Sequence, residues 1–396
     1  MLSKLAQNAN PSATLSINTR AKQLEKQGND VVKFTVGEPD FDTPENIKQA
    51  AHRALQAGRT KYAPAAGVLP LRKALSEKFK RDNGLDYDTD QIIVSNGAKQ
   101  ALYLMMLCLL EEGDDALLPA PFWGSYKAQV KTCHANPVPI DCTSSPDLGL
   151  TPELLEDAIT EDSKLLVLNS PCNPSGAVLD EETLRSIMDV ALENDLWVIS
   201  DEVYEHLLYD DATHTSPAGF SDEAYSRVIT INSFSKTYAM TGWRVGYAAG
   251  PEEVIHAAGC LQGNLTSAPN TPAQHAAIEA LEGEQDSVSD MREAFRQRRD
   301  LLMELLEDVP RVSCPTPRGA FYAFLNVEDV LGDTYFGDEV NTSEEMAESL
   351  LQNVSMAVVP GSAFGTDGYI RLSYVVGDET IEKGAERLTE FVHGAE

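Results

Sequence analysis

Residues 228–246 read VITINSFSKTYAMTGWRVG, and the order of apolar and polar residues in this segment is typical of one fold class. The apolar run Arg227–Ile231 predicts a buried strand, and a second run, Arg244–Ala249, predicts another. The polar segment between them puts Lys236 just after the carboxyl end of the first strand. In open α/β sheets ligands bind at that end of the strands. The stretch therefore predicts a ligand site that contains Lys236.

The middle of the chain repeats this pattern of short apolar runs separated by helical stretches. A clear helix pattern is Glu181–Asn194, with Asp180 as its N-cap. Runs with few polar breaks suit strands that are buried on both faces of a mainly parallel sheet. We therefore expect an α/β fold in which helices flank such a sheet. The remaining runs are Ile92–Val94, Ala116–Leu118, Lys164–Asn169 and Leu196–Ser200.

Both ends of the chain have a different pattern, which predicts a smaller α+β domain. We expect a large domain at 45–285 and a small one that combines 1–44 with 286–396. The expected elements of the small domain are helices at Asn10–Gln27, Ser287–Glu307, Ser343–Asn353 and Asp378–Val392, a hairpin-like segment at Ala320–Leu325, and a strand pair at Ala357–Val359 and Tyr369–Val375.

The charge composition excludes several kinds of partner. The 396 residues include 31 Lys and Arg against 62 Asp and Glu, a formal net charge of −31. Nucleic acids and anionic membranes need basic surfaces, so neither is expected as a partner. An anionic small substrate remains possible, because a few local cations can dominate a closed pocket. A high-salt cytoplasm and an ordinary acidic bacterial or archaeal protein explain the charge equally well.

Six scattered cysteines and an N-terminus without an apolar signal segment predict a cytoplasmic protein with reduced thiols. Glu202 and His206 could suggest a metal pair, but they are not joined by an HExxH motif. No metal is expected.

Lys236 could bind phosphate as a point charge, act as a nucleophilic amine, or be an ordinary solvated lysine. A P-loop requires GxxxxGK, and the residues before Lys236 contain no glycine at those positions. Its neighbours narrow the choice further, because Ser233, Ser235 and Thr237 precede a T-G-W-R-x-G segment at 241–246.

This combined pattern resembles the cofactor-lysine signature of the class I aminotransferases, which are fold type I pyridoxal-phosphate (PLP) enzymes. The resemblance runs from about Pro11 to Phe391 and is to the aspartate aminotransferase branch of bacteria and archaea. It implies that PLP is the cofactor, that Lys236 carries it covalently, and that the reaction is ping-pong, with Lys236 as general base and acid. It also implies a homodimer with shared sites.

The resemblance assigns further residues to the cofactor ring. Asp201, in the segment SDEVY at 200–204, would pair with the pyridine nitrogen, and Tyr204 with the phenolic oxygen. Asn173, in NSPCNPSG at 169–176, would donate to the same oxygen. Trp123 would stack on the ring. Taken alone, Asp201 could equally cap a helix, residues 169–176 could be a simple turn, and Trp123 could be a core residue.

The phosphate would be held mainly at the start of a helix, where free amides and partial charge favour anions. The remaining contacts come from two serines, an arginine and a tyrosine that reaches across the dimer interface. These residues are the amides of Ala98 and Lys99, the side chains of Ser233, Ser235 and Arg244, and Tyr62 from the other subunit.

The substrate residues begin with Arg371, in the predicted strand at Tyr369–Val375. A buried cation needs a partner, and the substrate α-carboxylate would provide one. The resemblance adds Gly37, together with Trp123 and Asn173, at the substrate. Lys99 and Thr14 would meet a distal carboxylate, which favours aspartate and 2-oxoglutarate.

Other activities remain open on the same scaffold. Aromatic and alanine aminotransferases share the cofactor site, and a C–S β-lyase would share it too. Prephenate-using relatives often carry a basic residue where this chain has Asn10, which argues against prephenate. A PLP-sensing regulator would need a basic helix-turn-helix, and no such segment precedes Pro11.

Overall fold

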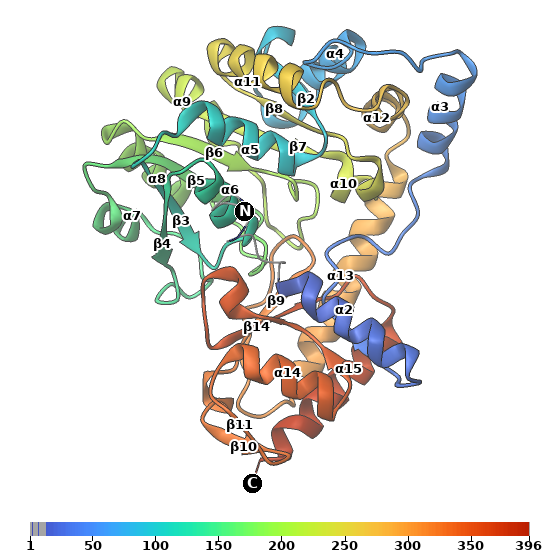
Figure 1. Ribbon diagram of the computed structural model, residues 1–396, viewed down its shortest axis with the longest axis vertical. Coiled ribbons are helices and arrows are strands. Elements are labelled where there is room, and N and C mark those ends of the chain that lie inside the picture. The colour runs from blue at the N-terminus through green and yellow to red at the C-terminus, as the bar shows by residue number, and fades with distance from the viewer. Residues whose placement is uncertain (1, 3–6, 8–12, 396) are drawn as a thin grey trace.

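The computed structural model describes residues 2, 7 and 13–395, with the side chains of 13–15 left out of that description. The described chain forms two lobes (Figure 1). We call residues 45–285 the sheet lobe, and we call α2 (Ala13–Lys26), β1 (Val32–Lys33) and everything from α13 (Asp286–Leu306) onward the terminal lobe. The long helix α13 of the terminal lobe reaches up to the sheet lobe (Figure 1).

A seven-stranded sheet in the order β2-β8-β7-β6-β5-β3-β4 forms the centre of the sheet lobe. All adjacent pairs are parallel except those of β8, which runs antiparallel to both β2 and β7. The mainly parallel α/β sheet predicted from the apolar runs is confirmed. The strands are β2 (Ile92–Ser95), β3 (Asp115–Ala120), β4 (Asn136–Asp141), β5 (Ser163–Asn169), β6 (Trp197–Asp201), β7 (Val228–Ser233) and β8 (Gly246–Ala249).

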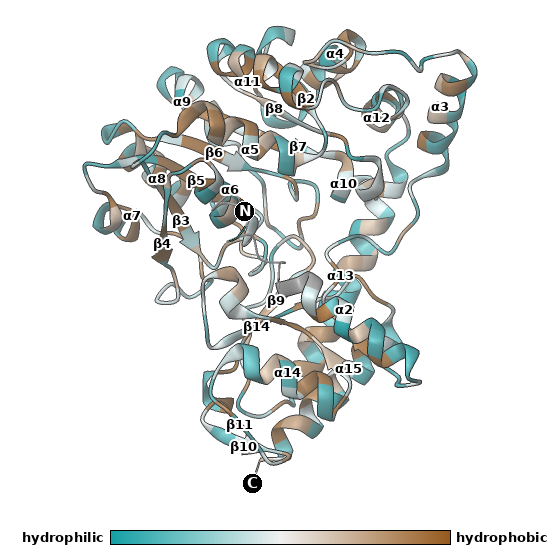
Figure 2. Cartoon of the chain, viewed as in Figure 1, coloured by the Kyte–Doolittle hydropathy of each residue, from teal (hydrophilic) through white to brown (hydrophobic). Residues whose placement is uncertain are grey.

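Helices cover both faces of this sheet, because the buried strands are apolar on both sides. In β7, Val228 packs into the cluster on one face, whereas Ile229 and Ile231 pack into the cluster on the other. Many helices carry both hydrophilic and hydrophobic stretches, as expected of amphipathic helices (Figure 2). One face is covered mainly by α5 (Ala98–Leu109), α6 (Ser125–Thr132) and α11 (Glu252–Leu265), the other by α3 (Glu45–Gln56), α4 (Leu69–Lys78), α8 (Glu181–Glu193) and α12 (Thr271–Glu282).

The terminal lobe combines both ends of the chain. Strand β1 pairs in parallel with β12 (Met356–Ala357), and an antiparallel sheet has the order β13-β14-β9. A further apolar cluster fills this lobe and extends into the sheet lobe at Tyr204, Leu207 and Tyr209. The domain boundaries at 45 and 285 stay a prediction. The other elements are β9 (Tyr322–Asn326), β10 (Asp333–Tyr335), β11 (Asp338–Val340), α14 (Ser343–Asn353), β13 (Val359–Pro360), β14 (Tyr369–Ser373) and α15 (Asp378–His393).

Most local predictions are confirmed, and the errors are wrong strand pairings and strands that were not predicted, such as β4. The Asp180 cap forms, since its carboxylate accepts from the Thr183 amide at 2.9 Å. The hairpin predicted at Ala320–Leu325 is wrong, because β9 pairs instead with β14, which is distant in sequence. Of the predicted pair at 357–359 and 369–375, Val359 does pair with β14, but Ala357 pairs with β1.

Nowhere in the described ranges is there a helix both long enough and apolar enough to cross a membrane. The cytoplasmic location stays a prediction.

Candidate active site

The candidate site lies where the carboxyl ends of β5, β6 and β7 face β14 of the terminal lobe. The last residues of these strands are Asn169, Asp201 and Ser233. Because β8 runs in the opposite direction, its first residue, Gly246, pairs with Ser233 at the same edge. The segment that carries Lys236 therefore leaves and re-enters the sheet at one place.

Lys236 lies on the short helix α10 (Phe234–Thr237), which Ser233 caps by accepting from the Ser235 amide at 3.3 Å. The Lys236 ammonium donates to the Gly37 carbonyl and lies 5.5 Å from the centre of the Phe321 ring. Burial, with Arg371 nearby, lowers the pKa of Lys236 to about 8. An amine with this pKa is partly neutral near pH 7–8 and can act as a nucleophile or base.

Asp201 is 3% exposed, and burial raises the pKa of its carboxyl group to about 6. The Tyr126 hydroxyl donates to its Oδ2 at 2.6 Å, which favours the charged form. Within the described residues no Lys, Arg or His lies within salt-bridge distance of this carboxylate. A buried acid without a cation fits a ligand that brings a protonated ring nitrogen.

Tyr126 and Tyr322 belong to the site and were not predicted. Tyr126 packs edge-on against Trp123 at 5.5 Å, because a turn before α6 joins the two residues, with the Tyr126 amide donating to the Trp123 carbonyl at 3.0 Å. The Tyr322 hydroxyl lies 3.0 Å from that of Tyr204. Tyr322 lies on β9, whose pairing was predicted wrongly, so no local sequence pattern indicated its position.

An anion cradle forms at the start of α5. Gly97 precedes this helix with φ +83°, and a Cβ there would collide with the Arg244 guanidinium. The amides of Ala98 and Lys99 open the helix and have no intrahelical acceptor. Ser233 is brought to the same edge by β7. This arrangement, with two free amides beside a fixed cation, fits a phosphate group.

Arg371 lies in the middle of β14 and is 3% exposed. Its guanidinium donates to Asn173 Oδ1 at 3.0 Å and to the Thr35 carbonyl at 3.1 Å, and it lies 4.4 Å from the Tyr322 ring. Its Nε has no hydrogen-bond partner, and burial lowers its pKa. No acidic group in the described part of the chain pairs with it. The arginine therefore fits a ligand carboxylate.

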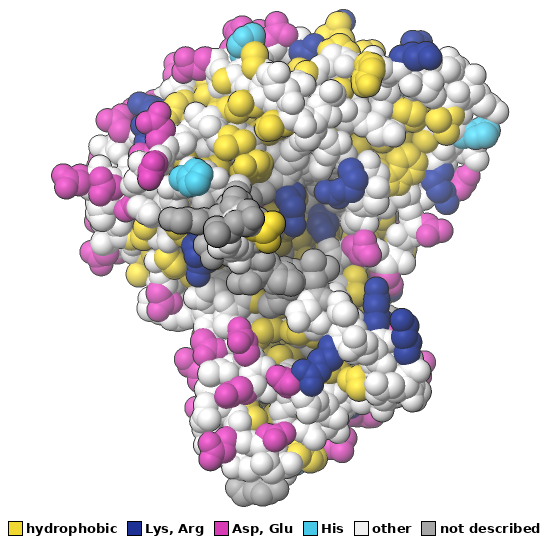
Figure 3. All heavy atoms as spheres, in the orientation of Figure 1, with side chains coloured by type: hydrophobic (Ala, Val, Ile, Leu, Met, Phe, Trp, Pro, Cys, Tyr) yellow, Lys and Arg dark blue, Asp and Glu magenta, His cyan; other side chains and the backbone are white. Residues whose placement is uncertain are grey.

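Lys99 and Trp123 line the same cleft, with the Lys99 ammonium 4.7 Å from the Trp123 ring. Burial, followed by the charge of Arg244, lowers the pKa of Lys99. Lys and Arg side chains gather around the hollow between the lobes, whereas Asp and Glu are spread over the outer surface (Figure 3). The cleft is therefore locally cationic in a protein of strongly negative net charge.

Residues 29–388 match the family described as Aminotransferase class I and II. The chain belongs to this family. Its members are generally PLP-dependent and transfer amino groups between amino acids and 2-oxo acids, so the protein is an aminotransferase with a fold type I architecture.

Individual relatives cover almost the whole aminotransferase. The aspartate/prephenate aminotransferase of Cereibacter sphaeroides is 42% identical over 395 residues, and the aspartate aminotransferase of Bacillus sp. is 43% identical over 392, each match covering 99% of both chains. Among solved structures, the Rhizobium meliloti aspartate aminotransferase superposes with a TM-score of 0.96 at 39% identity over 100% of both chains. That of Thermus thermophilus with maleate gives 0.92 at 41% over 99% of both.

Of the residues named from the sequence, Tyr62 lies apart from the others within this aminotransferase chain, and two more fall wholly or partly outside the described residues. Tyr62 is 98% exposed and lies on the outer surface of the protomer. Thr14 lies at the start of α2, but its side chain is outside the described residues, as is all of Asn10.

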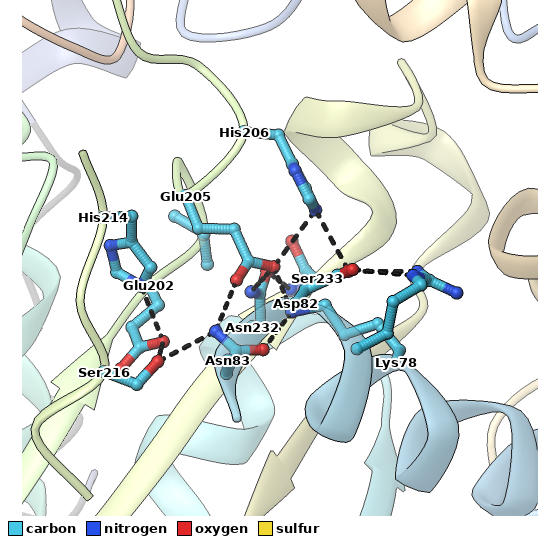
Figure 4. A network of polar contacts seen from close by, with 12 residues as sticks. Lys78, Asp82, Asn83, Glu202, Glu205, His206, His214, Ser216, Asn232 and Ser233 are labelled. Carbon is cyan, nitrogen blue, oxygen red and sulfur yellow. Dashed lines mark hydrogen bonds and ion pairs between the residues drawn. The ribbon is translucent and has the colours of Figure 1, made fainter. Parts of the chain in front are cut away.

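A buried charge network lies beside the ends of β6 and β7 (Figure 4). Its centre is Glu205, which forms an ion pair with Lys78 and accepts from Asn83 at 2.9 Å and from Asn232 at 2.6 Å. The Lys78 and Glu205 side chains are 2% and 4% exposed. Two residues of the candidate site have a network neighbour in the sequence, since Glu205 follows Tyr204 and Asn232 precedes Ser233.

The second carboxylate of the network, Glu202, directly follows Asp201. It accepts from Ser200 at 2.8 Å and from Ser216 at 2.6 Å, and lies 2.9 Å from His214. Burial opposes charge on His214, but Glu202 outweighs it and raises the pKa of this imidazole. Glu202 is therefore held by neutral donors and one histidine.

Glu202, Glu205 and His214 each offer a ligand atom within 4.8 Å of the others. The carboxylate oxygens already accept hydrogen bonds from the network, so a metal would have to displace these donors. His206, which the sequence suggested as a metal partner of Glu202, instead faces Glu205 at 3.4 Å and Asp82 at 3.8 Å.

Proposed function

We propose that this aminotransferase binds PLP covalently at Lys236 and transfers the amino group of L-aspartate to 2-oxoglutarate in a ping-pong cycle. The observation that carries the proposal is the meeting of three groups in one cleft. These are the Lys236 amine with a lowered pKa, the buried Asp201 carboxylate without a cation, and the buried Arg371 without an anion.

The described residues fit PLP at each part of the molecule. Asp201 would hold the proton on the ring nitrogen, Trp123 would lie on the ring, and Tyr204 and Asn173 would hydrogen-bond the phenolic oxygen. When bound, PLP supplies an electron sink for charge that develops at the substrate Cα. The phosphate would be held by the amides of Ala98 and Lys99 and by Ser233, Ser235 and Arg244.

Lys236 would move a proton between the substrate Cα and the C4′ atom of the cofactor. Proton transfer is efficient when the pKa of the base lies near the working pH, and a pKa of about 8 meets this condition. Arg371 would hold the α-carboxylate in a two-point contact, with Gly37 nearby. Closure of the terminal lobe over the cleft would exclude water.

The preference for aspartate rests on Lys99, whose ammonium lies in the cleft beside Trp123 and could meet a second carboxylate. Two kinds of relative support a dicarboxylate: those named aspartate aminotransferase, and the Thermus thermophilus enzyme solved with maleate. Prephenate stays a second candidate because the Cereibacter sphaeroides relative is named for both substrates. Thr14 would join Lys99 at the distal carboxylate.

A homodimer would complete the phosphate site. An aromatic side chain that is 98% exposed, such as Tyr62, is unusual on a free surface, and Leu265 and Leu69 are 58% and 44% exposed. Tyr62 of the other subunit would then reach the phosphate. The mass of the purified protein in solution tests this pairing.

Replacing the lysine tests the whole proposal. In Lys236→Ala the visible absorbance of lysine-bound PLP should disappear, and kcat should fall by about 10²–10⁴-fold, the range for loss of a general base. Lys127→Ala, at an exposed position on α6, is the control and should leave both unchanged.

The same assay separates the rival activities. Aspartate with 2-oxoglutarate should give glutamate, whereas a β-lyase would release pyruvate and ammonia from a suitable cysteine derivative. A wild-type protein that takes up no PLP, or a Lys236→Ala variant that keeps the wild-type activity, would contradict the proposal.

A further inference from the structure

The loop Gly37–Phe41 crosses from the terminal lobe to the sheet lobe directly over Lys236. On its terminal-lobe side, the Phe34 carbonyl accepts from the Ser373 amide at 2.9 Å. On its sheet-lobe side, the Thr43 hydroxyl donates to the Ala239 carbonyl at 2.7 Å. Between these ties the Gly37 carbonyl accepts from the lysine. Any shift of the loop therefore changes the roof of the substrate site.

Arg298 of α13 holds the far end of this loop. Its two terminal nitrogens donate to the two oxygens of Asp40 at 2.8 and 2.9 Å, a fork-to-fork pair. The guanidinium also lies 5.5 Å from the Phe41 ring and 5.8 Å from the Phe295 ring. The Arg298 side chain is only 14% exposed. Two hydrogen bonds and two rings thus fix one cation against the loop.

The rings around Arg298 continue to the reacting lysine. Phe41 contacts Phe295 edge-on at 5.7 Å, and Phe295 lies 5.7 Å from Phe321. Phe321 in turn lies 5.5 Å from the Lys236 ammonium. Phe295 and Phe321 are fully buried, so this aromatic row is a rigid support. The Asp40 end of the loop and the lysine therefore rest on one packed unit.

We propose that Arg298 is a positioning residue for substrate binding, which acts through Asp40 and Phe41 to hold Gly37 over Lys236. This inference rests on the proposed roles of Gly37 and Lys236. Without the clamp, each substrate molecule would have to order the loop as it binds. Such a cost weakens ground state and transition state alike, so it raises KM and leaves kcat nearly unchanged.

The test compares two arginines of the same helix. Arg296 is also ion-paired, with Glu293 and Asp300 at 2.7 Å each, but neither partner belongs to the loop. In Arg298→Gln the KM for aspartate should rise about five- to tenfold with kcat changed less than about twofold, whereas Arg296→Gln should match wild type. Arg298→Lys keeps the charge but loses the fork, and should be intermediate.

Asp40→Asn supplies a second, milder variant on the loop side. Because the two residues act as one unit, the KM of the double variant Asp40→Asn/Arg298→Gln should not exceed the higher of the two single-variant KM values. The visible absorbance of the loaded enzyme and the melting temperature should stay at the values of Arg296→Gln, which separates positioning from damage to the fold.

Additive effects, a fall in kcat as large as the rise in KM, or equal behaviour of the Arg298 and Arg296 variants would overturn the inference alone, provided that the wild type is active. A wild type that neither binds PLP nor transaminates would overturn the proposed function and this inference with it.

Discussion

The wall of the cleft formed by the ends of β6 and β7 is backed by a buried charge network, whereas the loop over the opposite side is held by pairs near the surface. The side chains of Lys78 and Glu205 are 2% and 4% exposed, while those of Arg298 and Asp40 are 14% and 36% exposed. On the loop itself, an exposed Glu38 accepts from Thr241 at 2.6 Å.

The difference in burial between these ion pairs suits two roles, a fixed wall and a movable roof of the cleft. A buried ion pair is costly to break, because removing one partner leaves an uncompensated charge away from water. It can hold Asp201 and Tyr204 in place whether or not a ligand is present. Contacts near the surface cost little to break and reform, so they suit a roof that must open for substrate and product. Three substitutions probe this contrast.

The largest effect is expected at the centre of the network. Burial alone would raise the pKa of Glu205, but Lys78 and two histidines lower it to about 2. Glu205→Gln leaves Lys78 unpaired and should lower the free energy of unfolding by about 3–5 kcal/mol at pH 7. Urea unfolding measures this change, with Glu25→Gln as control, since the Glu25–Lys33 pair is exposed and should cost less than about 1 kcal/mol.

The pH dependence gives an independent check. A carboxyl group whose pKa is lowered by folding stabilises the folded protein at pH values above its unfolded pKa of 4.5. This contribution is lost as the pH falls from 4.5 toward the folded pKa of about 2. The difference between wild type and Glu205→Gln should therefore shrink from pH 4.5 downward. Equal losses for Glu205 and Glu25 would refute the contrast between buried and exposed pairs.

An intermediate effect of opposite sign is expected at Asp201 in the cofactor-free protein. Its pKa is raised from 3.8 to about 6, first by burial, so the charged form costs stability when no ligand is bound. Asp201→Asn should therefore raise the free energy of unfolding by about 2–3 kcal/mol at pH 7. Asn can still accept from Tyr126, which keeps the variant well matched to wild type.

The penalty at Asp201 is absent below pH 3.8 and is complete above pH 6. Denaturation of the PLP-free proteins at several pH values should show the gain of Asp201→Asn growing across this window. With PLP added, the order should reverse, because the variant loses the ring-nitrogen contact. If cofactor-free Asp201→Asn is less stable than wild type, the buried Asp201 charge does not destabilise the cofactor-free protein.

The smallest effect is expected at the roof of the cleft. Thr241→Val removes the hydroxyl that donates to Glu38, and the free energy of unfolding should change by less than about 1 kcal/mol. The KM for the amino donor should still rise by about two- to threefold, since the loop loses one tie. Steady-state kinetics beside Thr132→Val, on the exposed side of α6, measures this. An unchanged KM would show that the Thr241–Glu38 hydrogen bond does not help to hold the loop over the cleft.

Residues whose position depends on local sequence were predictable. Asp201 and Lys236 follow apolar runs that become strands, so their place at the sheet edge follows from chain order alone. Arg371 was predictable for another reason, because a cation in a buried strand must find an anion. The roles of these residues stay proposals, but their meeting in one cleft is a fact of the fold.

The parts that were missed depend on contacts between distant segments. Phe321 and Tyr322 reach the site only because β9 pairs with β14, and no local pattern announces that register. Lys78 and Glu205 are also far apart in the sequence, so no local pattern pairs them. A lysine on an amphipathic helix normally faces water, so a buried Lys78 was not expected. Strand β4 was overlooked because Pro137 and Pro139 interrupt it, which an edge strand tolerates.

The reversed direction of β8 has a consequence for how such a protein can diversify. A single connection between β7 and β8 contains both Lys236 and Arg244, so any change in its length displaces the Lys236 amine and the Arg244 guanidinium together. Arg371 arrives on a separate lobe. With the roles proposed above, insertions and substitutions there would alter which acid is recognised while the chemistry stays intact, so new specificities would be more accessible to this scaffold than new reactions.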